Sequence, residues 1–153
     1  MPPRRAEIIT GETCLECGAC CVAQVDQAAY CNITPEDERR LGRKFVRLHV
    51  VYPPPLDAFV ALLNGTEPSH GAIRTRHVVH ASGPLAGVRT CQCVALEGTV
   101  LERAKCGIYP KRPEACRLAV QPGDAWCREL RRRVRAMARP RKARKTRRKS
   151  ETR

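Results

Sequence analysis

Residues 14–21 read Cys14-Leu15-Glu16-Cys17-Gly18-Ala19-Cys20-Cys21, and this stretch indicates what holds the protein together. Two residues between cysteines let both sulfurs reach one metal group, as in zinc ribbons and iron–sulfur sites. Adjacent side chains diverge by about 100° on a helix, so Cys20 and Cys21 are poorly placed to share one ion. On a helix, Cys14, Cys17 and Cys21 share a face. The alternative is a set of buried or redox-active thiols without a metal.

Cysteines return far along the chain, at Cys93, Cys106 and Cys116. No local segment offers four well-spaced thiolates for tetrahedral zinc or a four-iron cluster, so we expect a metal to bind across both segments. Such a metal stabilises the fold because it ties distant parts of the chain together. Arg112 and Arg117 lie either near the negative charge of this site or on the surface.

The two cysteine segments together resemble a known family. The pattern Cys14-x2-Cys17-x2-Cys20-Cys21, followed by Cys106-x-Ile108-Tyr109-x2-Arg112-Pro113-x2-Cys116-Arg117, is similar to the CxxCxxCC family, also called the YkgJ-like zinc- or iron-chelating domain. The resemblance spans about residues 12–120. It implies metal binding without a reaction, through the ligands Cys14, Cys17, Cys20, Cys21, Cys93, Cys106 and Cys116. A related motif in flagellin lysine methylases is associated with an iron–sulfur cluster.

The chain also departs from the family pattern. Its last motif runs into Leu118-Ala119-Val120-Gln121-Pro122, where family members often carry an aromatic residue and a proline, and the stretch from Cys93 to Cys106 is long. Three cysteines lie outside the motif, and we expect them to be spare thiols rather than additional ligands: Cys31, Cys91 and Cys127. The pair His77-x2-His80 has strand-like neighbours, so we do not expect metal ligation there.

The chain divides into a leader (1–12), a cysteine-cluster metal-binding domain (13–138) and a disordered basic tail (139–153). We expect a small, α-rich, irregular domain with little β structure, organised around the cysteine metal site. Only six of the 153 residues are Phe, Tyr or Trp, so the core is thin. The predicted helices are Thr34 to about Phe45, Leu56 to Leu63, and a last helix capped by Asp124 that buries Trp126, Leu130, Val134 and Met137; one short strand is predicted from Ile73 to Val79.

The charge is concentrated at the C-terminal end. Residues 131–153 contain 13 Lys or Arg and one Glu, which leaves only +2 of the net +14 for the rest of the chain. A block of like charge is typically solvated, and either solubilises the protein or contacts nucleic acid without sequence specificity. The N-terminal residues lack the apolar stretch of a secretory signal, and no segment is apolar enough for a membrane helix, so we expect a cytoplasmic protein with reduced thiols.

Three functions agree with these patterns. The first is a metal-binding protein that holds zinc or an iron–sulfur cluster, including the 4Fe–4S type, through both cysteine segments. The second is an iron–sulfur redox enzyme or one related to methyl transfer. The third is a nucleic-acid-associated protein that acts through residues 131–153.

Overall fold

The computed structural model describes residues 16–23, 29–67 and 70–138, and the prediction of an α-rich domain with little β structure is wrong. Of the described residues, 41% are helical and 26% lie in strands, which form antiparallel sheets. Most of these strands are difficult to recognise in the sequence because they have five residues or fewer. The strand Arg89–Cys93 (β4) also buries four consecutive residues, and strands buried on both faces show no alternating pattern.

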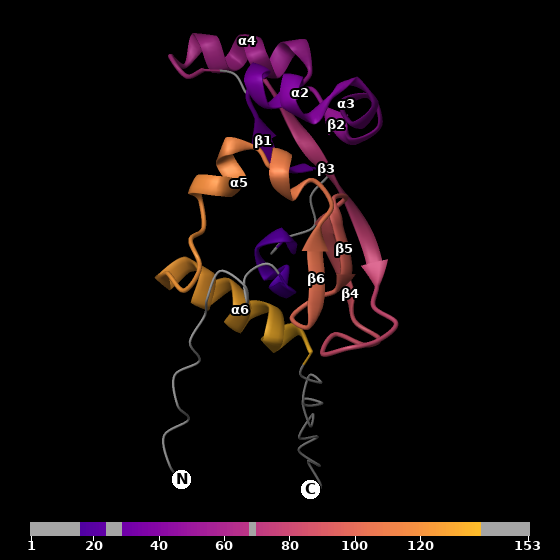
Figure 1. The fold of residues 1–153 in the computed structure, drawn as a ribbon. Coiled ribbons are helices and arrows are strands. Elements are labelled where there is room, and N and C mark those ends of the chain that lie inside the picture. Colours follow the sequence, from indigo (N-terminus) through magenta and orange to yellow (C-terminus); the bar gives the residue numbers. More distant parts are fainter. Residues whose placement is uncertain (1–15, 24–28, 68–69, 139–153) are drawn as a thin grey trace, which may run out of the picture.

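The long strand Gly71–Val79 (β3) organises the sheet (Figure 1). Its first half pairs with Ala29–Ile33 (β1) on one edge and with Val50–Val51 (β2) on the other, and its second half pairs with β4. The strand predicted from Ile73 to Val79 is therefore confirmed, but it has three partners. A separate hairpin joins Leu96–Thr99 (β5) to Arg103–Cys106 (β6).

The helix predicted after Thr34 begins as expected. Thr34 caps Pro35–Leu41 (α2): the Asp37 amide donates to the Thr34 hydroxyl at 3.1 Å, and the Thr34 amide donates to the Asp37 carboxylate at 3.0 Å. The predicted single helix to about Phe45 is wrong, because Gly42 adopts φ 85° and ψ 152°. A second helix, Arg43–His49 (α3), follows this break.

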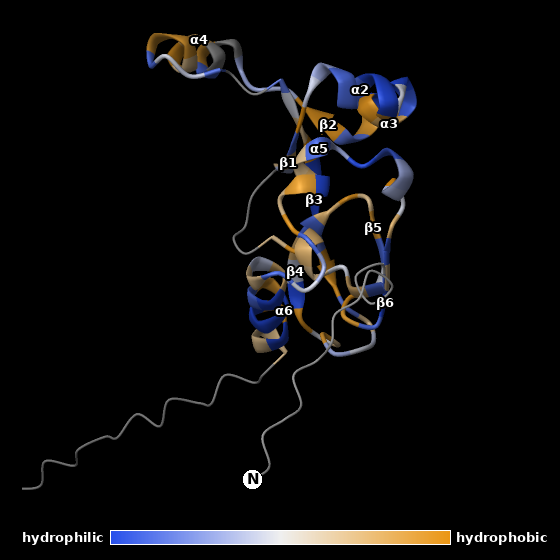
Figure 2. Ribbon diagram, turned by 60° about the vertical axis from the view of Figure 1, so that its left-hand side comes forward, coloured by the Kyte–Doolittle hydropathy of each residue, from blue (hydrophilic) through white to orange (hydrophobic). Residues whose placement is uncertain are grey.

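The predicted helix after the prolines is confirmed as Pro55–Leu63 (α4). It projects from the rest of the molecule beyond α2 and α3, and its ribbon is mostly apolar (Figure 2). Several of its large side chains are exposed: Leu56, Phe59, Val60, Leu62 and Leu63.

The last predicted helix is also present, as Ala125–Met137 (α6), and the Asp124 side chain accepts the Cys127 amide at its start. Leu130 and Val134 are buried as predicted. The prediction that Trp126 is buried is wrong, because its side chain is 46% exposed and Arg133 lies over its ring.

Three short elements complete the described chain: the 3-10 helix Ala19–Cys21 (η1), the 3-10 helix Tyr109–Lys111 (η2) and Glu114–Leu118 (α5). In Figure 1, η1 lies at the centre, with α5 and the β5–β6 hairpin on either side and α6 below it. This arrangement places both cysteine segments in the middle of the molecule.

The buried side chains form two groups. One joins η1 to the β5–β6 hairpin and α6, and includes Val22, Leu96 and Val134; the other joins β1, α2 and β3, and includes Ile33 and Ile73. Within the described ranges, no helix is long and apolar enough to span a membrane. The predicted leader (1–12), Cys14 and the predicted tail (139–153) lie outside the described residues.

Candidate functional site

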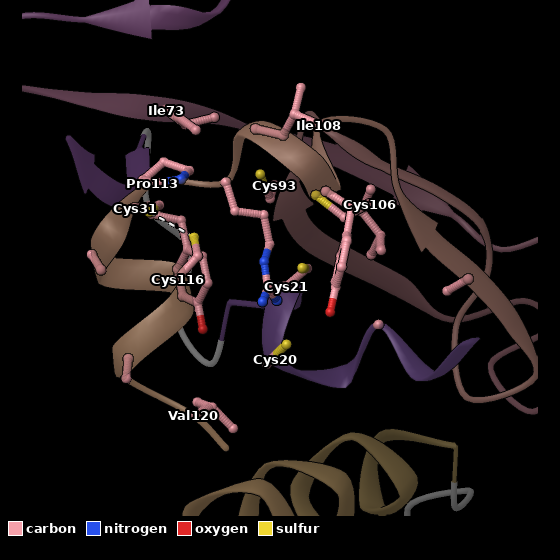
Figure 3. Close-up of a pocket in the computed structure, with 18 of the residues that line it drawn as sticks. Cys20, Cys21, Cys31, Ile73, Cys93, Cys106, Ile108, Pro113, Cys116 and Val120 are labelled. Carbon is pink, nitrogen blue, oxygen red and sulfur yellow. Dashed lines mark hydrogen bonds between the residues drawn. The ribbon is translucent and has the colours of Figure 1, made fainter. Parts of the chain in front are cut away.

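A cavity of about 320 Å³ lies between the two groups of buried residues, and sulfur atoms line much of it (Figure 3). A single water needs only about 10–15 Å³ by the same kind of measure, so this cavity has room for more than one small ion. The remaining lining is largely apolar or aromatic, and includes Tyr30, Ile73 and Ile108. The cysteines that line it are Cys20, Cys21, Cys31, Cys93, Cys106 and Cys116.

Backbone hydrogen bonds fix the first cluster against the β-strands. The Leu101 amide donates to the Cys17 carbonyl at 2.7 Å, and the Ala23 amide donates to the Cys91 carbonyl at 2.8 Å. Between these two hydrogen bonds, the chain turns at Gly18, which has φ 66°. The α-carbon of Gly18 faces the Ala104 and Leu96 side chains. Only a residue without a side chain permits both this backbone angle and this close approach. The turn directs Cys20 and Cys21 into the cavity.

The β-strands bring two more cysteines to the cavity from the opposite side. Cys93 is the last residue of β4 and is paired with Thr75 of β3, and Cys106 is the last residue of β6 and is paired with Leu96 of β5. The Gly107 amide donates to the Ala95 carbonyl at 2.8 Å, which fastens the end of β6 to the turn after Cys93. The hairpin accounts for the long interval between Cys93 and Cys106.

Cys116 comes from α5, which is attached to α2 by a buried carboxylate. The Asp37 side chain is 1% exposed and accepts the Glu114 amide at 3.1 Å, in addition to its bonds with Thr34 and Arg40. Burial raises the pKa of Asp37, but the hydrogen bonds from Thr34, Arg40 and Glu114 outweigh it and hold the pKa below its usual range. The charged form of Asp37 therefore holds the helix that carries Cys116.

Cys31, which was expected from the sequence to be a spare thiol, also lines the cavity. The pairing of β1 with β3 shifts register between Ala29 and Cys31, as in a β-bulge, and both Tyr30 and Cys31 line the cavity. A regular strand would direct consecutive side chains to opposite faces. The Cys31 sulfur lies 2.8 Å from the Cys116 sulfur. The sequence signal for this position is the alternation of Cys31, Asn32 and Ile33, which is typical of a strand with one buried face.

Of the two arginines expected near the site, the structure places Arg112 in the cavity and leaves Arg117 exposed on α5. The Arg112 guanidinium stacks on the Tyr109 ring, 4.1 Å from its centroid. Its Nε atom is buried and has no hydrogen-bond partner within the described part of the chain. A buried donor of this kind is costly unless an acceptor or a negative charge faces it.

The cavity controls the protonation of its thiols. The hydrogen bond with Cys21 lowers the pKa of Cys20 to about 7, and the positive charge of Arg112 acts in the same direction. The partner thiol, Cys21, has a raised pKa because of that hydrogen bond and of burial. Burial raises the pKa of Cys93 to about 11 and also raises the pKa of Cys106. A metal that binds here therefore has to displace protons from buried thiols.

The other cysteines and the histidines lie elsewhere. Cys17 lines a separate small space with Cys127, beside the buried side chain of Arg131. Burial raises the pKa of Cys17, although Arg131 partly opposes this effect. Cys91 faces His77 across the β3–β4 pair, outside the cavity lining. The remaining histidines are also outside it: His49 packs on Phe45, His70 bonds to Glu38, and His80 bonds to Thr90 at 2.8 Å.

Of the seven implied ligands, the cavity therefore gathers Cys20, Cys21, Cys93, Cys106 and Cys116. Cys17 lies apart, and Cys14 is outside the described residues. Among the described residues, no three His, Cys, Asp or Glu side chains stand close enough to hold one metal ion as they are arranged. Comparison with family models, with curated proteins and with solved structures finds no match to this chain.

Proposed function

We propose that the protein binds a metal group through the thiols of this cavity, and that the group is an iron–sulfur cluster rather than a single zinc ion. The observation that carries the proposal is the gathering of cysteines from η1, β4, β6 and α5 around one cavity. Soft thiolate donors suit both zinc and iron–sulfur clusters, so the donor chemistry fits either group. The resemblance to the CxxCxxCC family also implies a thiolate metal site.

The size of the cavity favours a cluster. A tetrahedral zinc ion with bonds of about 2.3 Å draws its four sulfurs to within about 3.8 Å of each other. In a cluster each iron takes its own thiolate, so the ligands line a larger volume. The cavity measures about 320 Å³, and six of the described cysteines line it. Cys93, Cys106, Cys116 and one of the Cys20–Cys21 pair would supply the four ligands.

The surroundings also suit a negatively charged cluster. Arg112 brings a positive charge and a buried Nε donor to the cavity, and a donor of this kind can bond to a thiolate or sulfide. The aromatic side chains of Tyr30 and Tyr109 line the same space. A bound cluster would supply one-electron chemistry or hold the two halves of the fold together.

The decisive experiment is anaerobic purification of the untagged chain, followed by a visible spectrum and assays of iron, sulfide and zinc on one sample. We expect a brown protein with iron and sulfide in similar amounts. If dithionite bleaches the colour, the cluster accepts electrons, and if it does not, the cluster has a potential below that of dithionite or is redox-inactive. A colourless protein that contains one equivalent of zinc would replace the cluster with a zinc site, and a metal-free protein would contradict the proposal.

A matched pair of variants locates the site. Cys93 and Cys91 lie two residues apart on β4 and are each 7% exposed, but only Cys93 lines the cavity. We expect Cys93→Ser to lose most of the metal and Cys91→Ser to retain it. Equal loss of metal from both variants would mean that the substitutions destabilise β4, and that the loss does not come from a missing ligand.

A further inference from the structure

Cys31 lines the cavity but is not a ligand of the proposed metal site, and its sulfur contacts that of the proposed ligand Cys116. Their sulfurs are 2.8 Å apart and belong to residues separated by 85 positions in the chain. Figure 3 shows the two side chains meeting at one wall of the cavity, from β1 and α5. Cys31 is buried and Cys116 is partly exposed to the cavity.

The spacing of this pair suits a covalent bond better than a shared metal ion. Two sulfurs on one zinc ion stand about 3.8 Å apart, whereas a disulfide holds them at about 2.05 Å. From 2.8 Å, the two sulfurs close to a disulfide with a relative movement of less than about 1 Å. Both backbone segments are already fixed in place, β1 by its pairing with β3 and α5 by the bond from Glu114 to Asp37.

We propose that Cys31 and Cys116 are a redox-active dithiol that a small-molecule disulfide, such as oxidised glutathione, converts reversibly to an intramolecular disulfide. The thiolate form of one member of the pair attacks the small disulfide, forms a mixed disulfide and releases one small thiol. The other cysteine then displaces the second small thiol and closes the bond between the two protein sulfurs. The protein loses two hydrogens and two electrons, and the small disulfide gains them as two thiols.

The disulfide itself does not depend on the metal, but its consequence rests on the proposed function. Oxidation would remove Cys116 from the ligands of the cavity, so the oxidised chain would take up less metal than the reduced chain. The same bond would tie β1 to α5 across a long loop and raise the melting temperature of the metal-free chain.

The test treats the metal-free, full-length chain with oxidised glutathione, traps free thiols by alkylation and maps cross-links by mass spectrometry. Cleavage before aspartate isolates Cys31 on residues 26–36, and trypsin isolates Cys116 on residues 112–117, with no other cysteine on either peptide. We expect these two peptides to appear first as one cross-linked species that dithiothreitol separates. Cross-links confined to other cysteines, or Cys31 and Cys116 alkylated while other thiols oxidise, would overturn the proposal.

Two variants complete the test. Cys31→Ser should leave Cys116 as a persistent mixed disulfide with glutathione, whereas Cys127→Ser, also a buried thiol, should still form the Cys31–Cys116 bond. Because the cross-link is mapped in the unaltered chain, a Cys31→Ser variant that fails to fold does not prevent a decision. Metal analysis of the reduced chain separately decides the proposed function, so either idea can fail without the other.

Discussion

The carboxylate of Asp37 in α2 accepts the backbone amide of Glu114 in α5 at 3.1 Å. These residues are 77 positions apart, and the bond holds the helix that carries Cys116 against the helix that follows Cys31. The Arg40 guanidinium, which pairs with Asp37, also donates to the Arg112 carbonyl at 3.4 Å. A single buried carboxylate therefore organises one side of the thiol cavity.

Replacing this carboxylate should destabilise the fold. We expect Asp37→Ala to lower the free energy of unfolding by about 2–4 kcal/mol, because it leaves buried donors without an acceptor. Urea denaturation measures the change. The control is Glu36→Ala, an exposed acid in the same first turn, which should cost about 0.5 kcal/mol or less. Equal costs for both variants would show that Asp37 only caps α2.

The contribution of Asp37 should also depend on pH. Its pKa is lowered in the folded chain, so its stabilising effect is complete above the unfolded pKa of about 3.9 and is lost as the pH falls through the lower, folded pKa. The difference in unfolding free energy between the unaltered chain and Asp37→Asn should be constant from pH 5 to pH 7, and should shrink below about pH 4. If the difference in unfolding free energy grew on acidification, the pKa of Asp37 would be raised in the folded chain and not lowered.

Gly18 should be irreplaceable at the first cluster. A β-carbon there would lie 2.7 Å from the Ala104 Cβ atom and 2.9 Å from the Leu96 Cδ1 atom, on a backbone with φ 66°. We expect Gly18→Ala to cost about 2–4 kcal/mol through strain and overpacking. Gly87→Ala is the matched control, with φ 76° and no atom within 4 Å of the new β-carbon. It should cost only the backbone strain, about 1–2 kcal/mol.

The two arginines near Cys116 should differ in their effect on the metal. We expect Arg112→Gln to speed the loss of bound metal to a chelator on the order of tenfold, because the cavity loses one of the positive charges that line it. Arg117→Gln, an exposed change on α5, should lose metal at the rate of the unaltered chain. If neither variant changed the rate of metal loss, the role of Arg112 would be to pack on Tyr109 and not to stabilise the metal group.

Local signals determined the helix starts and several of the candidate ligands. Thr34 and Asp124 were recognised as caps because a cap depends on side chains within three residues of the helix start. The cysteine spacing indicated one shared site, and the structure brings five of the seven implied ligands to one cavity. The position of Trp126 was mispredicted because helical periodicity does not show which face meets the protein.

Only the tertiary structure decided the sheet and the identity of the extra thiol. The strands of β4, β5 and β6 are four or five residues long, and they form because distant segments pair with them and not because of their own sequence. Cys31 enters the cavity through a local register shift against β3, which depends on a partner about 40 residues away in the chain. The sequence by itself determined that cysteines from two segments are available to meet. The tertiary structure decided which of them do, because strand pairing places Cys31, Cys93 and Cys106 and the bond from Glu114 to Asp37 places the helix of Cys116.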